Sequence, residues 1–383
     1  MVVAYRVKEA RALERRYDLD WIKVLATGLV IFYHCTMFFN PWPWHVKNND
    51  IDHSVILVLS LLIGSFIMPL FFAISGISLY FALQKRSIRV LLKERLLRLG
   101  IPLLFAVWVL SPPQVYIERF ASGQFTGSFL QFLPHYTDGL YLDIGGSGNF
   151  SFAGHHLWYV LVLLVFSAVL VPLLIRTKNS SAAFKGYHLI LLPVPLSLIK
   201  VLAPTIQLGG YDILFYLAVL LYGFYFLKDR TFTMVLEKYS TLLIAAASVS
   251  SVLWVTGFLQ QWNVLLLAAV QVLYCWSSVL LIFHLANKHL SFSNSSLRYF
   301  NEASMPYYVL HQPIIVIAGF FLRGLDLSVA LKFLLLACIA YGSVAALYHF
   351  AIKPYSLPRI LTGLNGKSRK KHIKSTPEEV SLY

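Results

Sequence analysis

Charged residues are scarce in this sequence. Only 13% of the 383 residues are Asp, Glu, Lys or Arg, whereas 58% are hydrophobic. A soluble domain of this length buries its core with far fewer apolar side chains, so the composition favours a protein whose solvent is a lipid bilayer. The scarcity of charge therefore argues against a soluble enzyme and for an integral membrane protein.

The sequence also lacks the short alternating strands of a membrane barrel. Instead it contains about ten apolar runs that are long enough to span a bilayer. Backbone amides in hydrocarbon must be satisfied within their own segment, so these runs predict helices. The predicted fold class is all-α, a polytopic bundle of about ten transmembrane helices. The runs lie near residues 20–40, 55–84, 99–117, 156–175, 187–204, 212–227, 239–259, 264–286, 303–322 and 328–352.

Acidic residues are too few to balance the basic ones: 32 Lys and Arg stand against 17 Asp and Glu, a formal charge of +15. Such an excess can indicate a nucleic-acid partner. Most of the basic residues, however, fall on one side of the membrane if the N-terminus is cytoplasmic, and the positive-inside rule explains that distribution. We therefore expect an N-in, C-in topology, the lipid bilayer as partner and no nucleic acid.

This topology divides the chain into three parts. We expect a basic cytoplasmic segment (1–19), a membrane domain (20–352) with an external loop at about 113–155, and a basic, disordered cytoplasmic tail (353–383). The first apolar run is longer than the core of a signal peptide and lacks a small-residue cleavage site, so we expect it to remain as an anchor.

Cysteines and soluble-enzyme motifs are also few. Cys35, Cys275 and Cys338 all fall in apolar runs, so the sequence does not predict a disulfide framework.

The sequence contains no phosphate-binding loop, GxSxG, dinucleotide fingerprint or HExxH. The adjacent His155 and His156 lack a typical metal-ligand spacing. We predict neither a metal nor a bound cofactor.

The first apolar run, YDLDWIKVLATGLVIFYH, is unusual because it carries ionisable groups. At about 100° per residue, one face of this helix gathers four polar residues: Asp20, Lys23, Thr27 and His34. Such a stripe must face other helices or water. Lys23 could simply reach the headgroups beside Asp20, and His34 could serve helix packing. For His34 we favour a function, because an ionisable group at that depth is unusual.

Other runs carry polar groups at comparable depth. Ser75 and Gly76 could contribute to a site, although packing of small residues explains them equally well. Arg95 and Arg98 lie one turn apart and suit a phosphate-bearing ligand, or act as positive-inside anchors.

Two further groups of residues lie near the ends of runs. Ser304, Tyr308 and His311 share one face of RYFNEASMPYYVLHQPIIV, in which Pro313 is expected to free a backbone carbonyl. His155, His156 and Trp158 lie at the outer mouth of another run, where they could bind a ligand or, for the aromatic residue, join an interfacial belt. The long external segment is rich in Gly and aromatic residues, which could stack on a sugar or pack on the membrane surface.

A polar track through a helical bundle is also typical of a transporter. The sequence shows no internal repeat and no pair of Gly/Pro-broken helices, which weakens that alternative.

Six segments in order resemble the acyltransferase 3 family, and within it the glucan-biosynthesis protein C-like branch. They are YDLDWIKVLATGLVIFYH, FFAISGISLYFAL, KERLLRLGIPLLF, PPQVYIERFASGQFTGSFLQF, GHHLWYVLVLLVF and ASMPYYVLHQPIIV, of which the fourth resembles that branch in particular. The resemblance implies a multi-pass enzyme of the bacterial inner (cytoplasmic) membrane. It would move an acetyl or succinyl group from cytoplasmic acyl-CoA, a co-substrate, to a hydroxyl of an extracytoplasmic glycan or glucan.

The resemblance also implies residue roles. The family's motifs fall on Lys23 with His34, on Ser75 with Gly76, and on Arg95 with Arg98. Two positions depart from the family pattern: Lys23 replaces the commoner Arg, and Ile77 replaces Phe.

We accordingly expect three sets of site residues. The catalytic set is His34, Lys23 and Asp20, with His34 acting as general base or as acyl carrier. The acyl-CoA-binding set is Arg95, Arg98, Ser75 and Gly76. The acceptor-binding or supporting set is His155, His156, Trp158, Ser304, Tyr308 and His311. The sequence leaves open which acyl group is moved and whether the protein forms a homo-oligomer.

Overall fold

The computed structural model describes residues 15–178, 183–202, 207–208 and 211–366. The predictions for the N-terminal segment and the basic tail concern mainly residues 1–14 and 367–383, which lie outside the described residues.

The first half of the described chain is helical, and its elements follow one another with few long loops. They are α2 (Tyr17–Met37), α3 (Val55–Lys85), α4 (Ile88–Arg95), the π-helical turn η1 (Leu96–Gly100), α5 (Ile101–Phe105), the π-helical turn η2 (Ala106–Leu110), α6 (Ser111–Ala121), α7 (Phe129–Phe132), the 3-10 turns η3 (Leu133–Thr137) and η4 (His155–Leu157), and α8 (Trp158–Leu174).

The second half is also helical, apart from one pair of two-residue antiparallel strands. Its elements are α9 (His188–Leu191), α10 (Pro193–Leu202), β1 (Gln207–Leu208), β2 (Tyr211–Asp212), α11 (Ile213–Tyr225), α12 (Arg230–Lys238), α13 (Ser240–Leu259), α14 (Val264–His289), α15 (Ser295–Leu322), α16 (Val329–Ala346), the π-helical turn η5 (Leu347–Ile352) and α17 (Ser356–Leu361).

Seven helical stretches of the described chain are long and apolar enough to cross a membrane: Val55–Lys85, Ile88–Ala121, His155–Leu174, Ser240–Leu259, Val264–His289, Ser295–Leu322 and Val329–Ile352. Two shorter apolar helices are His188–Leu202 and Ile213–Tyr225. The polar stripe of α2 lowers its hydropathy, so α2 is not among the seven. The all-helical membrane class is confirmed, whereas the number of ten spans and the N-in, C-in orientation stay predictions.

The segment expected to form an external loop starts as helix. The apolar stretch from Ile88 continues through the two π-helical turns as far as Ala121, so α6 forms the first part of the segment expected at about 113–155. Pro112 and Pro113 stand near the start of α6, and the helical stretch continues through them although neither has an N–H to donate. α6 therefore holds side chains beneath the loop that follows it.

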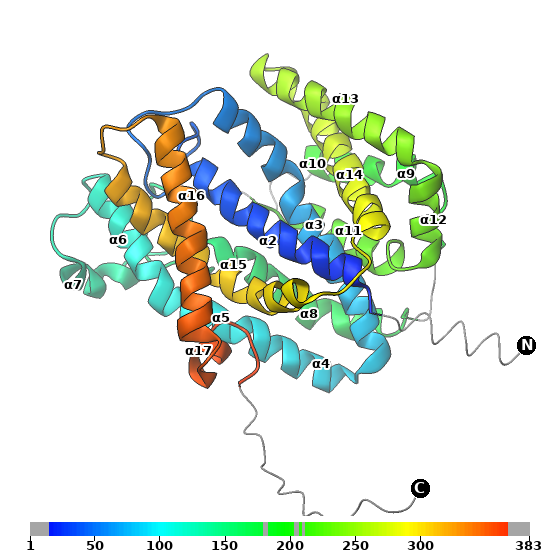
Figure 1. Ribbon diagram of the computed structural model, residues 1–383, viewed down its shortest axis with the longest axis horizontal. Coiled ribbons are helices and arrows are strands. Elements are labelled where there is room, and N and C mark those ends of the chain that lie inside the picture. The colour runs from blue at the N-terminus through cyan, green and yellow to red at the C-terminus, as the bar shows by residue number, and fades with distance from the viewer. Residues whose placement is uncertain (1–14, 179–182, 203–206, 209–210, 367–383) are drawn as a thin grey trace, which may run out of the picture.

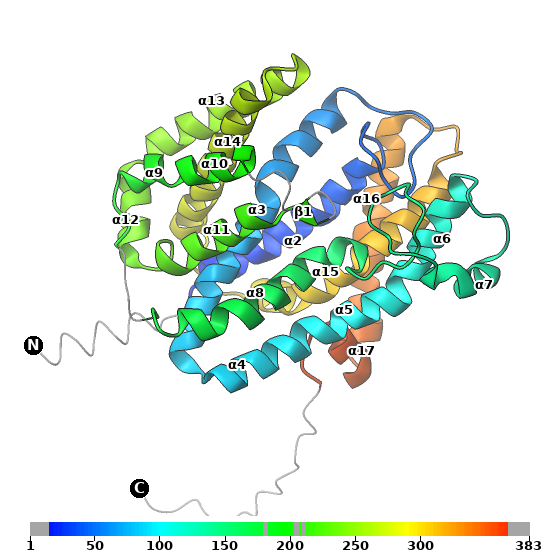
Figure 2. The same cartoon turned by 180° about the vertical axis from the view of Figure 1, so that it is seen from behind.

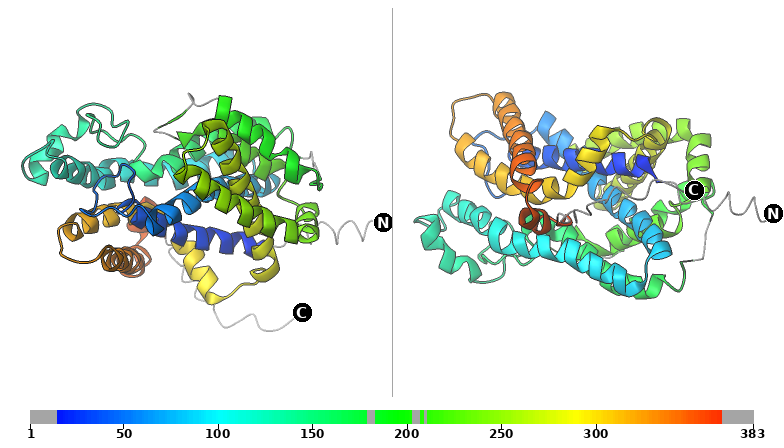
Figure 3. Two further views of the ribbon diagram at one scale, coloured as in Figure 1. Left: turned by 90° about the horizontal axis from the view of Figure 1, so that it is seen from above. Right: turned by 60° about the horizontal axis from the view of Figure 1, so that its bottom comes forward.

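Helix α2 lies at the centre of the bundle, packed against α3, α14, α15 and α16. α6 and α7 lie at one end of the molecule, and α12 lies at the other (Figure 1, Figure 2). The segment that follows α6 stands out at its end of the bundle when the molecule is turned (Figure 3). The N-terminus of α2 points away from that segment, so α2 connects the two ends.

Two glycines let α3 and α11 approach at backbone distance. A Cβ atom at Gly76 would lie 2.0 Å from the Leu220 carbonyl oxygen, and one at Gly223 would lie 2.2 Å from the Ala73 carbonyl oxygen. Neither position has room for a side chain. Close packing of small residues, one of the two interpretations considered for Gly76, therefore accounts for this residue.

Candidate active site

Three predicted histidines from three distant segments meet inside the bundle. His34 Nδ1 on α2 lies 2.8 Å from His311 Nε2 on α15. The ring of His156, from η4, lies 4.8 Å from that of His311 and 6.4 Å from that of His34, measured between centroids. His311 is completely buried and His156 is 4% exposed. We call His34, His156 and His311 the histidine cluster.

Proline chemistry explains how α15 holds His156. Pro313 has no N–H, so the carbonyl of Val309, four residues earlier, has no helical partner. His156 Nε2 lies 3.1 Å from that carbonyl oxygen and donates to it. The freed carbonyl expected from the sequence thus positions one member of the cluster.

The histidine cluster borders a cavity of about 830 Å³, which we call the outer cavity. Its lining includes His34, Trp44, His45, His155 and His156. The ring of Trp44 stacks on that of His34, with centroids 5.3 Å apart and planes inclined by 26°. A ligand in this cavity can therefore reach the ring of His34.

A buried carboxylate holds the wall of the outer cavity. Glu118 of α6 accepts hydrogen bonds from His45 Nδ1 (2.6 Å) and from the Tyr141 hydroxyl (2.7 Å) on one oxygen. Its other oxygen accepts from Gly145 N (2.8 Å) and from Arg119 Nη1 (3.0 Å). Burial and the Glu118 charge raise the pKa of Tyr141, which keeps its hydroxyl protonated as a donor. Glu118 therefore ties loop residues to α6.

His45 is engaged on both sides of its ring. It donates through Nδ1 to Glu118, and its Nε2 accepts from Gln312 Nε2 at 3.0 Å. The same Gln312 amide donates to Gln114 Oε1 at 3.2 Å. With both nitrogens occupied, His45 is suited to holding the cavity rather than to moving protons.

Three buried polar atoms of the cavity-lining residues have no hydrogen-bond partner among the residues described. They are Trp44 Nε1, His155 Nε2 and His156 Nδ1. Leaving a buried donor or acceptor unpaired costs about 1–3 kcal/mol, so such atoms are rare unless a ligand satisfies them. An indole N–H and two imidazole nitrogens at one cavity suit a ligand that both accepts and donates hydrogen bonds.

A basic cluster lies towards the end of the bundle where α2 begins. Lys23, Arg95 and Arg98 are close enough that the charge of Arg98 repels both of the others. The π-helical turn η1 begins directly after Arg95 and contains Arg98, and the two arginines have different partners: Arg95 interacts with Tyr159, while Arg98 Nη2 donates to Asn365 Oδ1 at 3.3 Å. The two arginines therefore do not bind a common partner as expected, but both contribute positive charge to the same region as Lys23.

Hydroxyl groups connect the basic cluster with the histidines. The Ser75 and Tyr159 hydroxyls lie 2.7 Å apart, and the ring of Tyr159 lies 6.0 Å from that of Tyr308. The Tyr308 hydroxyl donates to the backbone carbonyl of His156. Ser75 and Tyr308 thus lie on one polar route between Arg95 and the histidine cluster.

Three of the predicted residues that lie outside the histidine cluster have other surroundings. Asp20 pairs with Arg15 at 2.8 Å and lies about 21 Å along α2 from His34. Ser304 Oγ donates to the Phe300 carbonyl and faces a different cavity. Trp158 is only 5% exposed, so it is not part of a lipid-facing aromatic belt, although it does contribute to the lining of the outer cavity.

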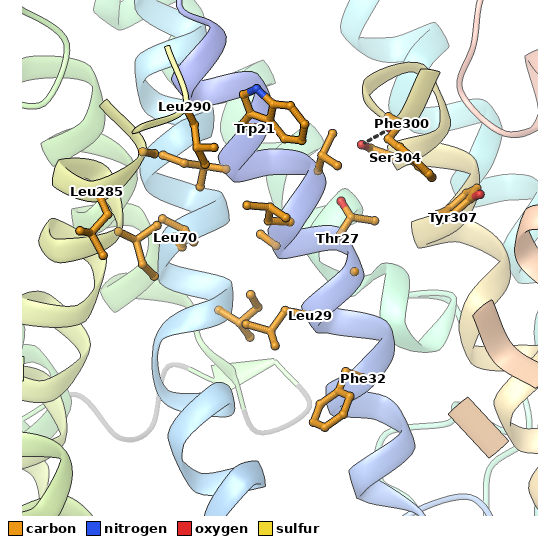
Figure 4. A pocket seen from close by; sticks show the side chains of 18 of the residues that line it. Trp21, Thr27, Leu29, Phe32, Leu70, Leu285, Leu290, Phe300, Ser304 and Tyr307 are labelled. Carbon is orange, nitrogen blue, oxygen red and sulfur yellow. Dashed lines mark hydrogen bonds between the residues drawn. The ribbon is translucent and has the colours of Figure 1, made fainter. Parts of the chain in front are cut away.

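The cavity that Ser304 faces lies on another side of α2 and has about 940 Å³ (Figure 4). Trp21, Leu29, Phe32, Leu70 and Leu285 are among the side chains drawn around it. This lining is mainly apolar and suits hydrocarbon. Of these two cavities, the outer cavity is the one lined by residues of the histidine cluster.

Comparison with known proteins identifies the family. The Acyl_transf_3 family, described as an acyltransferase domain, matches residues 16–349. The chain belongs to the acyltransferase 3 family. The match includes the whole histidine cluster and the basic cluster, and with the apolar helices it makes the protein a multi-pass membrane acyltransferase.

Several curated relatives share one name, "Glucans biosynthesis protein C". The relatives from Escherichia coli strain K12 / DH10B and from Shigella dysenteriae serotype 1 are each 25% identical to the chain. Each alignment covers 91% of this chain and 95% of the relative. No solved structure matches the chain significantly.

The sequence missed several residues of the site, namely Trp44, His45, Glu118, Tyr141 and Gln312. The only sequence feature that could have indicated one of them was the charged pair Glu118–Arg119, directly after an apolar run.

The histidines raise the question of a metal, and within the described parts of the chain no three His, Cys, Asp or Glu side chains are arranged to hold one.

Proposed function

We propose that this acyltransferase moves an acetyl or succinyl group from acyl-CoA on the cytoplasmic side of a bacterial inner membrane to a hydroxyl of an extracytoplasmic glycan. The observation that carries the proposal is the His34–His311 hydrogen bond beside a polar cavity, in a bundle whose other large cavity is apolar. In this account His34 is the catalytic residue.

The basic cluster supports acyl-CoA as the donor. Coenzyme A carries phosphates, and arginine binds phosphate through paired N–H groups while lysine contributes a point charge. Lys23, Arg95 and Arg98 offer both kinds of contact near the start of α2. The thioester would extend from them past Ser75 and Tyr159 towards His34, along the polar route.

The chemistry at His34 needs one unprotonated ring nitrogen. As a general base, that nitrogen takes the proton of the acceptor hydroxyl while the oxygen attacks the thioester carbonyl, and the C–S bond breaks to give the CoA thiolate, which receives the proton. As an acyl carrier, the nitrogen attacks the thioester carbonyl first, and the C–S bond breaks to release the CoA thiolate. The acceptor hydroxyl then attacks the acyl-imidazole, the C–N bond breaks to free His34, and the hydroxyl proton goes to the thiolate. Both routes join acyl carbon to acceptor oxygen and release CoA thiol.

The outer cavity supports a carbohydrate acceptor. Its unpaired atoms can exchange hydrogen bonds with sugar hydroxyls, and the Trp44 ring offers an aromatic face at the same place. The relatives named "Glucans biosynthesis protein C" favour a glucan. A transporter, the alternative left open by the sequence, loses its main support because the family is one of acyltransferases.

The proposal is tested with purified protein in detergent, where no sealed compartments exist. Acetyl-CoA and succinyl-CoA are supplied separately with a mixed pool of linear and cyclic glucans, and acylated glucan is measured by mass spectrometry. We expect product with one donor, which identifies the acyl group. Absence of acylated glucan with both donors, from protein that remains folded, would refute the proposed donor and acceptor.

A further inference from the structure

Backbone carbonyls of α15 determine which ring nitrogen of His311 carries hydrogen. His311 Nδ1 lies 2.7 Å from the Tyr308 carbonyl oxygen and 3.2 Å from that of Tyr307. A carbonyl oxygen only accepts, so Nδ1 must carry the hydrogen and donate it. In a neutral imidazole the other nitrogen, Nε2, then has a lone pair.

Both His311 and His34 are best described as neutral. In the described chain no carboxylate is hydrogen-bonded to either ring; their partners are each other and backbone carbonyls. A buried imidazolium without a counter-charge is costly, so each ring carries a single hydrogen.

The hydrogen of His34 follows from that of His311. His34 Nδ1 lies 2.8 Å from His311 Nε2, and two lone pairs would repel each other at that distance. The hydrogen between them therefore belongs to His34 Nδ1, which donates. The Val30 carbonyl also hydrogen-bonds the His34 ring, as an acceptor for a ring N–H. The lone pair of His34 is then on Nε2.

We propose that His311 is a positioning residue that holds His34 in its Nδ1–H tautomer, so that Nε2 is the nitrogen that reacts. The inference rests on the proposed function of His34 and deepens it. Within the acceptor-binding or supporting set expected from the sequence, it gives His311 a supporting role. The stacked Trp44 ring fixes the plane of the same imidazole beside the outer cavity.

This assignment serves both chemical routes. If His34 is a general base, Nε2 receives the acceptor proton and passes it to the CoA thiolate as the C–S bond breaks. If His34 is a carrier, Nε2 forms a C–N bond with the acyl carbon as the C–S bond breaks and the CoA thiolate leaves; the C–N bond then breaks as the acceptor oxygen bonds to the acyl carbon, and the hydroxyl proton goes to the thiolate. In either case His311 Nε2 keeps accepting the Nδ1 hydrogen while positive charge develops on His34.

A pair of substitutions separates positioning from simple packing. Glutamine places an acceptor oxygen near the position of His311 Nε2, whereas leucine fills the space without one. We expect His311→Leu to lower kcat by roughly 10²–10⁴-fold, the order seen when a catalytic histidine loses its tautomer partner. We expect His311→Gln to stay within about 10-fold of wild type, with KM for donor and acceptor unchanged in both.

The control is another buried histidine of the bundle. His284 of α14 is 5% exposed and pairs with Glu237, away from the outer cavity. His284→Leu should leave kcat unchanged. Equal activity of His311→Leu and wild type would overturn the proposal, as would failure of His311→Gln to exceed His311→Leu in folded protein.

The tautomer can also be observed without any activity. The ¹⁵N spectrum of histidine-labelled protein is compared with that of His34→Ala to identify the two His34 nitrogens. We expect an N–H signal for Nδ1 and a lone-pair signal for Nε2 in wild type, and a changed pattern in His311→Leu. The reverse pattern in wild type would overturn the assignment. Absence of acyl transfer by wild type would instead refute the proposed function, and the spectrum would still decide the tautomer.

Discussion

His156 donates a hydrogen bond to the carbonyl that Pro313 leaves without a helical partner. The donor and the proline come from distant parts of the chain, and the acceptor is Val309, at 3.1 Å from His156 Nε2. The bond leaves His156 Nδ1 unpaired and buried among the histidine cluster. A break in one helix thus orients a ring supplied by another.

Replacing this proline tests that orientation. Pro313→Ala restores an N–H that can bond to Val309, so His156 loses its partner. We expect activity to fall by about 10-fold, as for loss of a positioning hydrogen bond, while the thermal midpoint stays equal or rises. The control is Pro306→Ala in the same helix, which frees no carbonyl used by His156. Unchanged activity of Pro313→Ala would contradict a role for this bond.

Tyr141→Phe tests whether the wall of the outer cavity matters for the acceptor. The substitution removes one hydrogen bond to Glu118, which we expect to lower the free energy of unfolding by about 1–1.5 kcal/mol. Because the loop then holds the cavity less firmly, we expect the KM for glucan to rise several-fold. The KM for acyl-CoA should stay the same, because the basic cluster is distant from this loop. A rise in the donor KM, with the acceptor KM unchanged, would place the acceptor elsewhere.

The basic cluster makes a separate prediction about donor binding. Lys23→Ala should raise the KM for acyl-CoA by about 10-fold, because one charge near the phosphates is lost. For the same reason, the KM of this variant should depend less on salt concentration than that of wild type. Lys23→Arg keeps the charge and adds a planar fork, so we expect the donor KM to be equal or lower. Steady-state kinetics with varied acyl-CoA decides this. If Lys23→Arg raises the donor KM as much as Lys23→Ala does, positive charge at residue 23 is not what binds the phosphates of acyl-CoA, which would contradict the prediction.

Two glycines of the bundle provide a matched test of packing. Gly76→Ala pushes a methyl group onto the Leu220 carbonyl, so we expect a loss of about 1–3 kcal/mol in stability, together with reduced yield of folded protein. Gly28→Ala meets no atom within 4 Å and should stabilise α2 by roughly 0.5–1 kcal/mol. Thermal unfolding in detergent measures both. Equal midpoints for the two variants would mean that α3 and α11 can separate without cost.

Helix positions were predictable because apolar runs of spanning length leave the backbone no alternative. The contact of His34 with other helices was predictable for a related reason: the stripe on α2 had no interpretation as a lipid-facing surface. The spacing of Ser304 and His311 correctly suggested one face of α15. It could not show that Ser304 lines the apolar cavity whereas His311 is buried against His34, because that depends on which helices pack beside them.

Three of the site residues that the sequence missed lie in segments without a helical period. Trp44 and His45 follow α2 in a loop, and Tyr141 lies in the long segment after α6, so no spacing links them to Glu118. Arg95 and Arg98 were expected to share one helix face, but a π-helical turn begins after Arg95 and the two side chains have different partners. The sequence contains no sign of that turn.

The most direct test of the central claim is the rate of acyl transfer to glucan by His34→Ala beside wild type and His284→Ala, all in detergent. The account predicts that His34→Ala loses at least about 10³-fold in kcat while remaining folded, and that His284→Ala matches wild type. A His34→Ala enzyme that transfers the acyl group at a rate near wild type would contradict the account, since neither the general-base nor the carrier route exists without that ring.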